Sequence, residues 1–130
     1  MADTNNVYVR MNGPLLEGRA PAIVEAAMVS AVAEVADYTK FEVLSQLHEV
    51  LQHPTGYYES QITDQTITPT LHRIHDNMVI YGPWLEGVGS RNYPVTRFKG
   101  YHTFRLVKNR MRRKAKQIVA DHVARLVKTL

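Results

Sequence analysis

A long stretch without helix breakers is the feature that most constrains this chain. Between Pro21 and His53 the sequence contains neither glycine nor proline. Apolar residues recur within it at spacings of three and four, which predicts a helix over residues 20–52. Such a helix is roughly 50 Å long, whereas a domain of this length has a radius of gyration of about 14 Å. The helix must therefore bend, break or project, and we expect a bend at residues 38–41, which are poor helix formers.

A second long helix is predicted over residues 101–130, from the same apolar spacing. Aromatic and β-branched residues between the helices predict three strands, at residues 57–63, 66–75 and 78–81. A strand or an extended arm precedes the first helix within residues 1–14, and Pro69 predicts an edge position or a bulge for the middle strand. The expected fold class is α+β, with element order β-α-β-β-β-α and two long helices covering one face of a small antiparallel sheet.

Length and composition fit one domain over residues 1–130, with a long polar loop at residues 87–100 that is suited to assembly. The chain contains no cysteine, so disulfides and thiolate ligands are excluded. No apolar run reaches the roughly 18 residues that cross a bilayer, and no membrane partner is expected. The polar N-terminus lacks the pattern of a signal peptide, which predicts maturation in a cytosol-like compartment.

Charge is divided unevenly along the chain. Residues 1–90 carry four basic and eleven acidic residues, whereas residues 91–130 carry twelve basic residues and one acid. The acids of the first helix form the expected acidic partner face: Glu25, Glu34, Asp37, Glu42 and Glu49. The basic cluster lies on the last helix: Arg105, Lys108, Arg110, Arg112, Arg113, Lys114 and Lys116. This cluster is a solvated face, a phosphate-binding surface, or a contact with the acidic helix of a neighbouring copy.

Motifs for catalysis and cofactor binding are missing from the sequence. It contains no GxSxG, no GxxxxGK[ST] and no HExxH. His72 and His75 resemble a metal pair, but a spacing of three directs them to opposite faces of a strand. We predict no catalytic, cofactor-binding or metal-binding residue and therefore no enzyme. A titratable group enclosed in an apolar pocket would favour an enzyme instead.

The segment from Tyr81 to Gly87 is the most distinctive in the chain. Pro83 suits a brief helical turn, Trp84 and Leu85 are apolar anchors, and Gly87 can reverse the chain direction. One interpretation is a corner that closes the core around the only tryptophan. The other is a binding or assembly site, because the corner leads directly into a long polar loop.

This corner and the residues after it resemble the neck or tail-completion proteins, the head-to-tail connectors, of long-tailed bacteriophages (siphophages). The similarity is carried by Val79-Ile80-Tyr81-Gly82-Pro83-Trp84-Leu85-Glu86-Gly87, Ser90-Arg91-Asn92, Thr96-Arg97-Phe98-Lys99-Gly100-Tyr101 and Phe104-Arg105. The residues that match the family motif are Tyr81, Gly82, Trp84, Leu85, Glu86, Gly87, Arg97, Phe98 and Gly100.

The resemblance implies a structural subunit of the virion neck, assembled in the bacterial cytoplasm, that forms a ring through which the genome passes. Six copies are expected by analogy with other neck rings, with twelve as the alternative. The implied partners are other copies of the chain, a stopper or adaptor protein above, and a tail terminator or tail tube below. Contact with genomic DNA would be transient. A tail terminator or head-closure stopper at the same junction is the alternative function, and a basic nucleic-acid-binding module is a further one.

Overall fold

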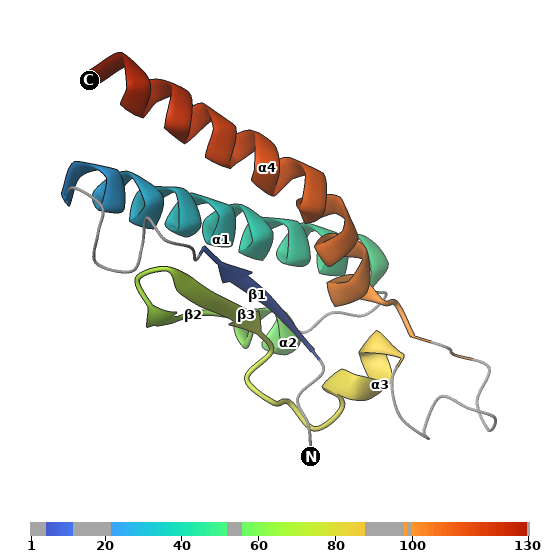
Figure 1. Cartoon of the computed structure of the whole chain (residues 1–130). Coiled ribbons are helices and arrows are strands. Elements are labelled where there is room, and N and C mark those ends of the chain that lie inside the picture. Colours follow the sequence, from blue (N-terminus) through green and yellow to red (C-terminus); the bar gives the residue numbers. More distant parts are fainter. Residues whose placement is uncertain (1–4, 12–21, 52–55, 88–97, 99, 130) are drawn as a thin grey trace.

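The computed structural model describes residues 5–11, 22–51, 56–87, 98 and 100–129, and they form four helices and three strands. The strands are β1 (Asn6–Arg10), β2 (Thr63–Thr68) and β3 (Leu71–His75). The helices are α1 (Ala22–Val50), α2 (Tyr57–Ser60), α3 (Gly82–Glu86) and α4 (Thr103–Thr129). Both long helices lie on one side of the sheet (Figure 1). The predicted α+β class, with a small antiparallel sheet and two long helices, is confirmed.

The three strands form an antiparallel sheet in the order β1-β3-β2. Val7 of β1 lies opposite Ile74 of β3, and both are buried beneath the helices. Tyr8 and Arg73, the next pair in the register, lie on the other face, where the Arg73 guanidinium stands 5.9 Å from the centre of the Tyr8 ring. This alternation places Val7 and Ile74 under the helices and Tyr8 and Arg73 on the opposite face, as expected for a two-layer fold.

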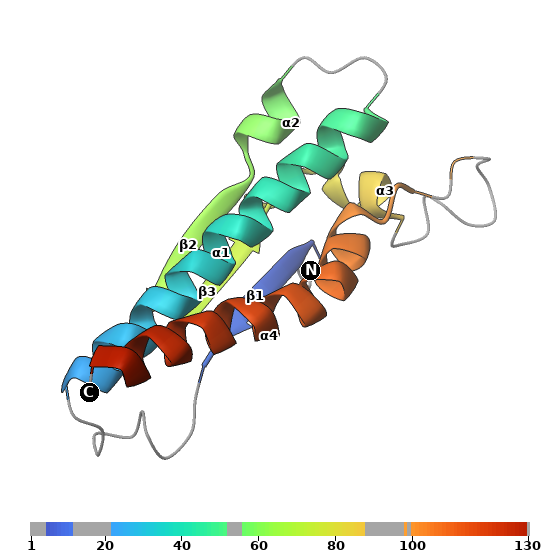
Figure 2. The same cartoon turned by 90° about the horizontal axis from the view of Figure 1, so that it is seen from above.

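The core lies between the sheet, α1 and the first half of α4. Its buried apolar side chains include Val35, Val43, Leu47, Ile74, Phe104, Val107, Met111 and Ile118. The two long helices run antiparallel along one another (Figure 2). Among the described residues beyond Ile118, α4 carries no buried residue. The free energy that holds α4 in place therefore comes mainly from its first four turns.

The expected bend in the first helix is wrong, because α1 is continuous from Ala22 to Val50 and has no kink along its length (Figure 1). Thr39, at the expected bend, is fully buried, and its hydroxyl donates to the carbonyl of Val35 at 2.7 Å. The threonine therefore satisfies its hydroxyl within the helix instead of breaking it. Packing against both the sheet and α4 overrides the weak local helix propensity.

The four expected strands are also corrected to three. Residues 57–60 form α2, entered through Gly56 at φ 85°, and β2 begins only at Thr63. The predicted strand over residues 66–75 is divided by a turn at residues 69–70, so that Pro69 ends a strand, and the bulge lies between Thr66 and Thr68. Residues 78–81 form no strand. Alternating β-branched residues predict extended backbone but do not decide where it reverses.

Two further expectations concern the chain ends and the membrane. A strand or an extended arm is expected within residues 1–14, and residues 6–10 of this segment form β1 of the sheet. Residues 1–4 and 12–14 lie outside the described part of the chain, as does most of the expected loop at 87–100. Among the described residues, no helix combines the length and apolar character needed to span a bilayer.

Candidate functional site

The corner that carries the family resemblance is a compact structural unit around α3. Pro83 occupies the first turn of α3, where its missing N–H costs nothing, and Gly87 ends the helix at φ 96°. The Gly87 N–H donates to the Pro83 carbonyl at 2.9 Å. Gly82 packs so closely on the Asp76 carboxylate that a Cβ at this position would overlap it. Gly87 is therefore required by its backbone conformation, and Gly82 by the closeness of the Asp76 carboxylate.

Glu86 joins the corner to the last helix. Its carboxylate accepts hydrogen bonds from the backbone N–H groups of Phe104, at 2.9 Å, and Arg105, at 3.1 Å. These N–H groups are in the first turn of α4, where no intrahelical acceptor exists. Burial raises the pKa of the Glu86 carboxyl, while the two backbone hydrogen bonds and the nearby His102 and Arg105 oppose that rise. Glu86 is therefore a helix cap supplied from a distant segment.

The backbone closes the same corner from the other side. The N–H of Tyr101 donates to the Leu85 carbonyl at 2.7 Å, and that of His102 to the Glu86 carbonyl at 3.1 Å. Gly100 adopts φ 96°, and a Cβ there would overlap the backbone of Gly87. The segments on either side of the polar loop are thus fixed against each other, which positions the start of α4.

Aromatic side chains fill the space around the corner. The Phe98 ring lies 4.5 Å from that of Trp84 and 4.8 Å from that of Tyr101, between ring centroids. The Tyr81 ring stands 5.8 Å from that of Tyr58 and is still 39% exposed. Leu85 packs against the core. Of the nine motif residues, eight therefore gather at this corner, and Arg97 lies outside the described residues.

A buried polar clasp, missed by the sequence reasoning, supports the corner. The Asp76 carboxylate, 1% exposed, accepts hydrogen bonds from the Tyr58 hydroxyl at 2.8 Å and from the Asn5 amide at 3.0 Å. Burial and the adjacent Asp76 carboxylate raise the pKa of the Tyr58 hydroxyl. The three residues belong to distant parts of the chain, so no local pattern could have revealed the clasp.

The basic cluster of α4 is divided between two directions. Arg110 contacts α1, where it donates to the Glu42 carboxylate at 3.1 Å and to the Gln46 side chain. The Lys114 ammonium lies 5.0 Å from the centre of the Tyr38 ring. These contacts are partly exposed, so each contributes about 1 kcal/mol or less. These contacts of Arg110 and Lys114 therefore align α4 on α1 but add little to the free energy of folding.

The other five cations of the cluster are exposed and point away from these contacts. Their side chains have no ion-pair or hydrogen-bond partner among the described residues. They are Arg105, Lys108, Arg112, Arg113 and Lys116. Helix positions advance by about 100° per residue, which places all of these except Arg113 on the flank of α4 turned away from α1. This outer flank is the largest group of unneutralised charge in the described chain.

The acids of α1 do not form one face, contrary to expectation. Glu42 pairs with Arg110, and Glu34 contacts His122 Nε2 at 2.6 Å, both within the same chain. Glu25, Asp37 and Glu49 are exposed. They are twelve residues apart, and steps of about 100° separate them by about 120° around the helix. Two of the five acids of the expected acidic face thus contact α4 of their own chain.

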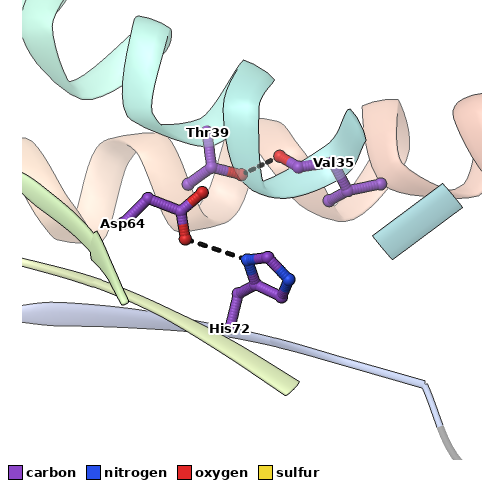
Figure 3. A network of polar contacts seen from close by, with 4 residues as sticks. All are labelled: Val35, Thr39, Asp64 and His72. Carbon is purple, nitrogen blue, oxygen red and sulfur yellow. Dashed lines mark hydrogen bonds and ion pairs between the residues drawn. The ribbon is translucent and has the colours of Figure 1, made fainter. Parts of the chain in front are cut away.

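The histidines of β3 lie on opposite faces of the sheet, as predicted. His72 Nδ1 lies 2.9 Å from the Asp64 carboxylate on the face covered by α1, close to Thr39 (Figure 3). His75 Nδ1 accepts a hydrogen bond from the Asn77 N–H at 2.9 Å. Among the described residues, no three histidine or acidic side chains gather into a metal-binding group.

Comparison with known proteins adds no assignment: no family model, curated protein or solved structure matches the chain significantly. Two features of the molecule therefore bear on its function. One is the corner around Glu86, and the other is the outer flank of α4.

Proposed function

We propose that the chain is a structural subunit of the neck between the head and tail of a long-tailed bacteriophage, where copies form a ring around the path of the genome. The observation that carries this proposal is the corner. Of the nine residues that match the family motif, four set the backbone path or close packing of the corner or cap α4, namely Gly82, Glu86, Gly87 and Gly100. The resemblance therefore lies in residues that determine the fold of this corner, and not in scattered surface positions.

The exposed charge of α4 also supports an assembly role. Five exposed cations have no ion-pair or hydrogen-bond partner among the described residues, although Arg105 lies near Glu86; they repel one another and add little to the stability of one copy. They become favourable when an anionic surface approaches. A neighbouring subunit supplies such a surface through acids, and the genome through phosphates during passage. A ring that gripped DNA through all five would slow its passage, so we assign most of them to protein contacts.

Cryo-electron microscopy of assembled particles tests this proposal. We expect a ring of density between the portal and the tail tube, into which copies of this α+β fold fit. Deletion of the gene should leave filled heads and tails that do not join. Particles that contain no copy of the chain, or hold it as a single isolated copy, would contradict the proposal. A ring at the tail terminator or stopper position would support the alternative station instead.

A nucleic-acid-binding module is the second candidate, and the outer flank of α4 is the observation that favours it. If the four cations of this flank contact phosphates, the logarithm of affinity should fall with the logarithm of salt at a slope of about −3.6. Arg112→Glu should then weaken binding more than Arg113→Glu, because Arg113 lies on another side of α4. Undetectable binding of a DNA duplex at about 0.1 M salt would exclude this function.

A further inference from the structure

The contact between α1 and α4 within one chain has a simple pattern. Arg110 and Lys114, four residues apart on α4, face Glu42 and Tyr38, four residues apart on α1. One cation meets an acid, and the next meets an aromatic ring. Because residues four apart lie on one side of a helix, this pattern fits two antiparallel helices in one register.

The outer flank of α4 repeats the cationic half of this pattern. Lys108 and Arg112 are four residues apart and exposed. The same flank continues into valines in the second half of the helix: Val119, Val123 and Val127. Val123 is 41% exposed and Val127 is 62% exposed. Valine loses side-chain freedom in a helix and is a weak helix former. Val119 is half-buried, but the stability of α4 alone gives no reason for the exposed Val123 and Val127.

The solvent side of α1, beside the side that contacts α4, carries an acid and an aromatic ring in the reverse order. Asp37 and Phe41, four residues apart, are both exposed; Phe41 is 61% exposed, and its ring lies 6.3 Å from that of Tyr38, between ring centroids. Toward the start of the helix this side carries apolar and small residues at spacings of three and four: Ile23, Ala26, Ser30 and Ala33. We call these six positions the outer face of α1.

We propose that the outer flank of α4 packs antiparallel against the outer face of α1 of a second copy, repeating between copies the contact made within each. The inference rests on the proposed ring function and names its interface. Arg112 then faces Asp37 of the second copy, and Lys108 faces its Phe41. The pairing is heterologous, because each copy offers one surface on each side, and repeated pairing produces a ring or a filament.

A single register of the two helices matches both the charged part and the apolar part of each surface. When Arg112 stands opposite Asp37, moving eleven residues along each helix in opposite directions brings Val123 opposite Ala26. The valines then lie against Ile23, Ala26 and Ser30, while the cations lie against Asp37 and Phe41. Phosphates would explain the cations of this flank but not its valines. A second copy accounts for both, so we favour it over nucleic acid as the occupant.

Cysteine crosslinking tests the register directly, because the chain contains no cysteine of its own. We expect the full-length Ala26→Cys/Val123→Cys variant to form a ladder of covalent oligomers on mild oxidation. The two positions lie on opposite outer sides of the helix pair, so the ladder requires contact between copies. The matched control is Ala26→Cys/Ala124→Cys, in which the second cysteine is also exposed but lies on another side of α4.

Charge reversal in the crosslinking variant tests the proposed ion pair. Asp37→Arg or Arg112→Asp should each lower the yield of crosslinked oligomer by roughly tenfold, and the two together should restore it. Arg113→Asp makes the same charge change away from the interface and should leave the yield unchanged.

The outcomes separate this inference from the ring function. A ladder that is lost on either reversal and restored by both supports the interface. No ladder, or equal ladders from both cysteine pairs, overturns it. If particles nevertheless contain a ring of this chain, the neck function stands with a different interface. If particles lack the chain, the neck function fails whatever the crosslinking shows.

Discussion

Truncating Glu86 to alanine tests whether the corner holds α4 in place. The substitution removes the acceptor of two backbone N–H groups in the first turn of α4, those of Phe104 and Arg105. A hydrogen bond to a charged acceptor contributes at least about 1.5 kcal/mol, so the two together contribute about 3 kcal/mol. Part of this loss is offset because the variant no longer buries a carboxylate. We therefore expect Glu86→Ala to lower the free energy of unfolding by about 2 kcal/mol.

Urea unfolding followed by circular dichroism measures this change. Glu49→Ala is the matched control, because Glu49 is an exposed acid on a helix and its loss should change stability by less than about 0.5 kcal/mol. Glu86→Gln keeps the size and one acceptor oxygen, and should lie within about 1 kcal/mol of the native chain. If Glu86→Ala were no more destabilising than Glu49→Ala, the capping argument would be wrong.

The contribution of Glu86 to the stability of the fold should decrease as the pH rises. Its pKa is raised in the folded state above the ordinary value of 4.5, mainly by burial. The folded chain therefore holds this proton more tightly than the unfolded chain, which stabilises the fold below pH 4.5. That stabilisation is lost as the pH rises through the folded pKa. As the pH rises from 4.5 through the folded pKa, the free energy of unfolding of the native chain should therefore fall relative to that of Glu86→Gln. A difference between the two that does not change with pH would contradict a raised pKa of Glu86.

Three further substitutions test the backbone and the clasp. Met78→Gly should raise the free energy of unfolding by about 1 kcal/mol in thermal or urea unfolding, because Met78 is 64% exposed and adopts φ 55°. Gly100→Ala should lower it by more than about 2 kcal/mol, since φ is 96° and the new Cβ would overlap Gly87; an unchanged value would contradict the corner geometry. Tyr58→Phe should cost about 2 kcal/mol by removing the 2.8 Å hydrogen bond to buried Asp76, and a cost below about 0.5 kcal/mol would show that the clasp is dispensable.

Parts of the corner could be read from the sequence, whereas its main contact could not. Pro83 and Gly87 bracket a short helix because each residue acts on its own backbone. The role of Glu86 depends on two N–H groups that lie 18 and 19 residues later in the chain. A glutamate before a glycine gives no local sign of such a partner. The corner was therefore predictable as a turn but not as the cap of α4.

The two long helices were set by the sequence itself, because apolar spacing and the absence of helix breakers act within a few residues. The uneven distribution of charge was likewise visible without a structure. Only the tertiary structure decided that α1 runs straight through Thr39, that Glu42 serves Arg110 of its own chain, and that Asp76 binds a side chain 71 residues away. Such contacts join distant segments, and their free energy depends on how the layers pack, so no local pattern encodes them.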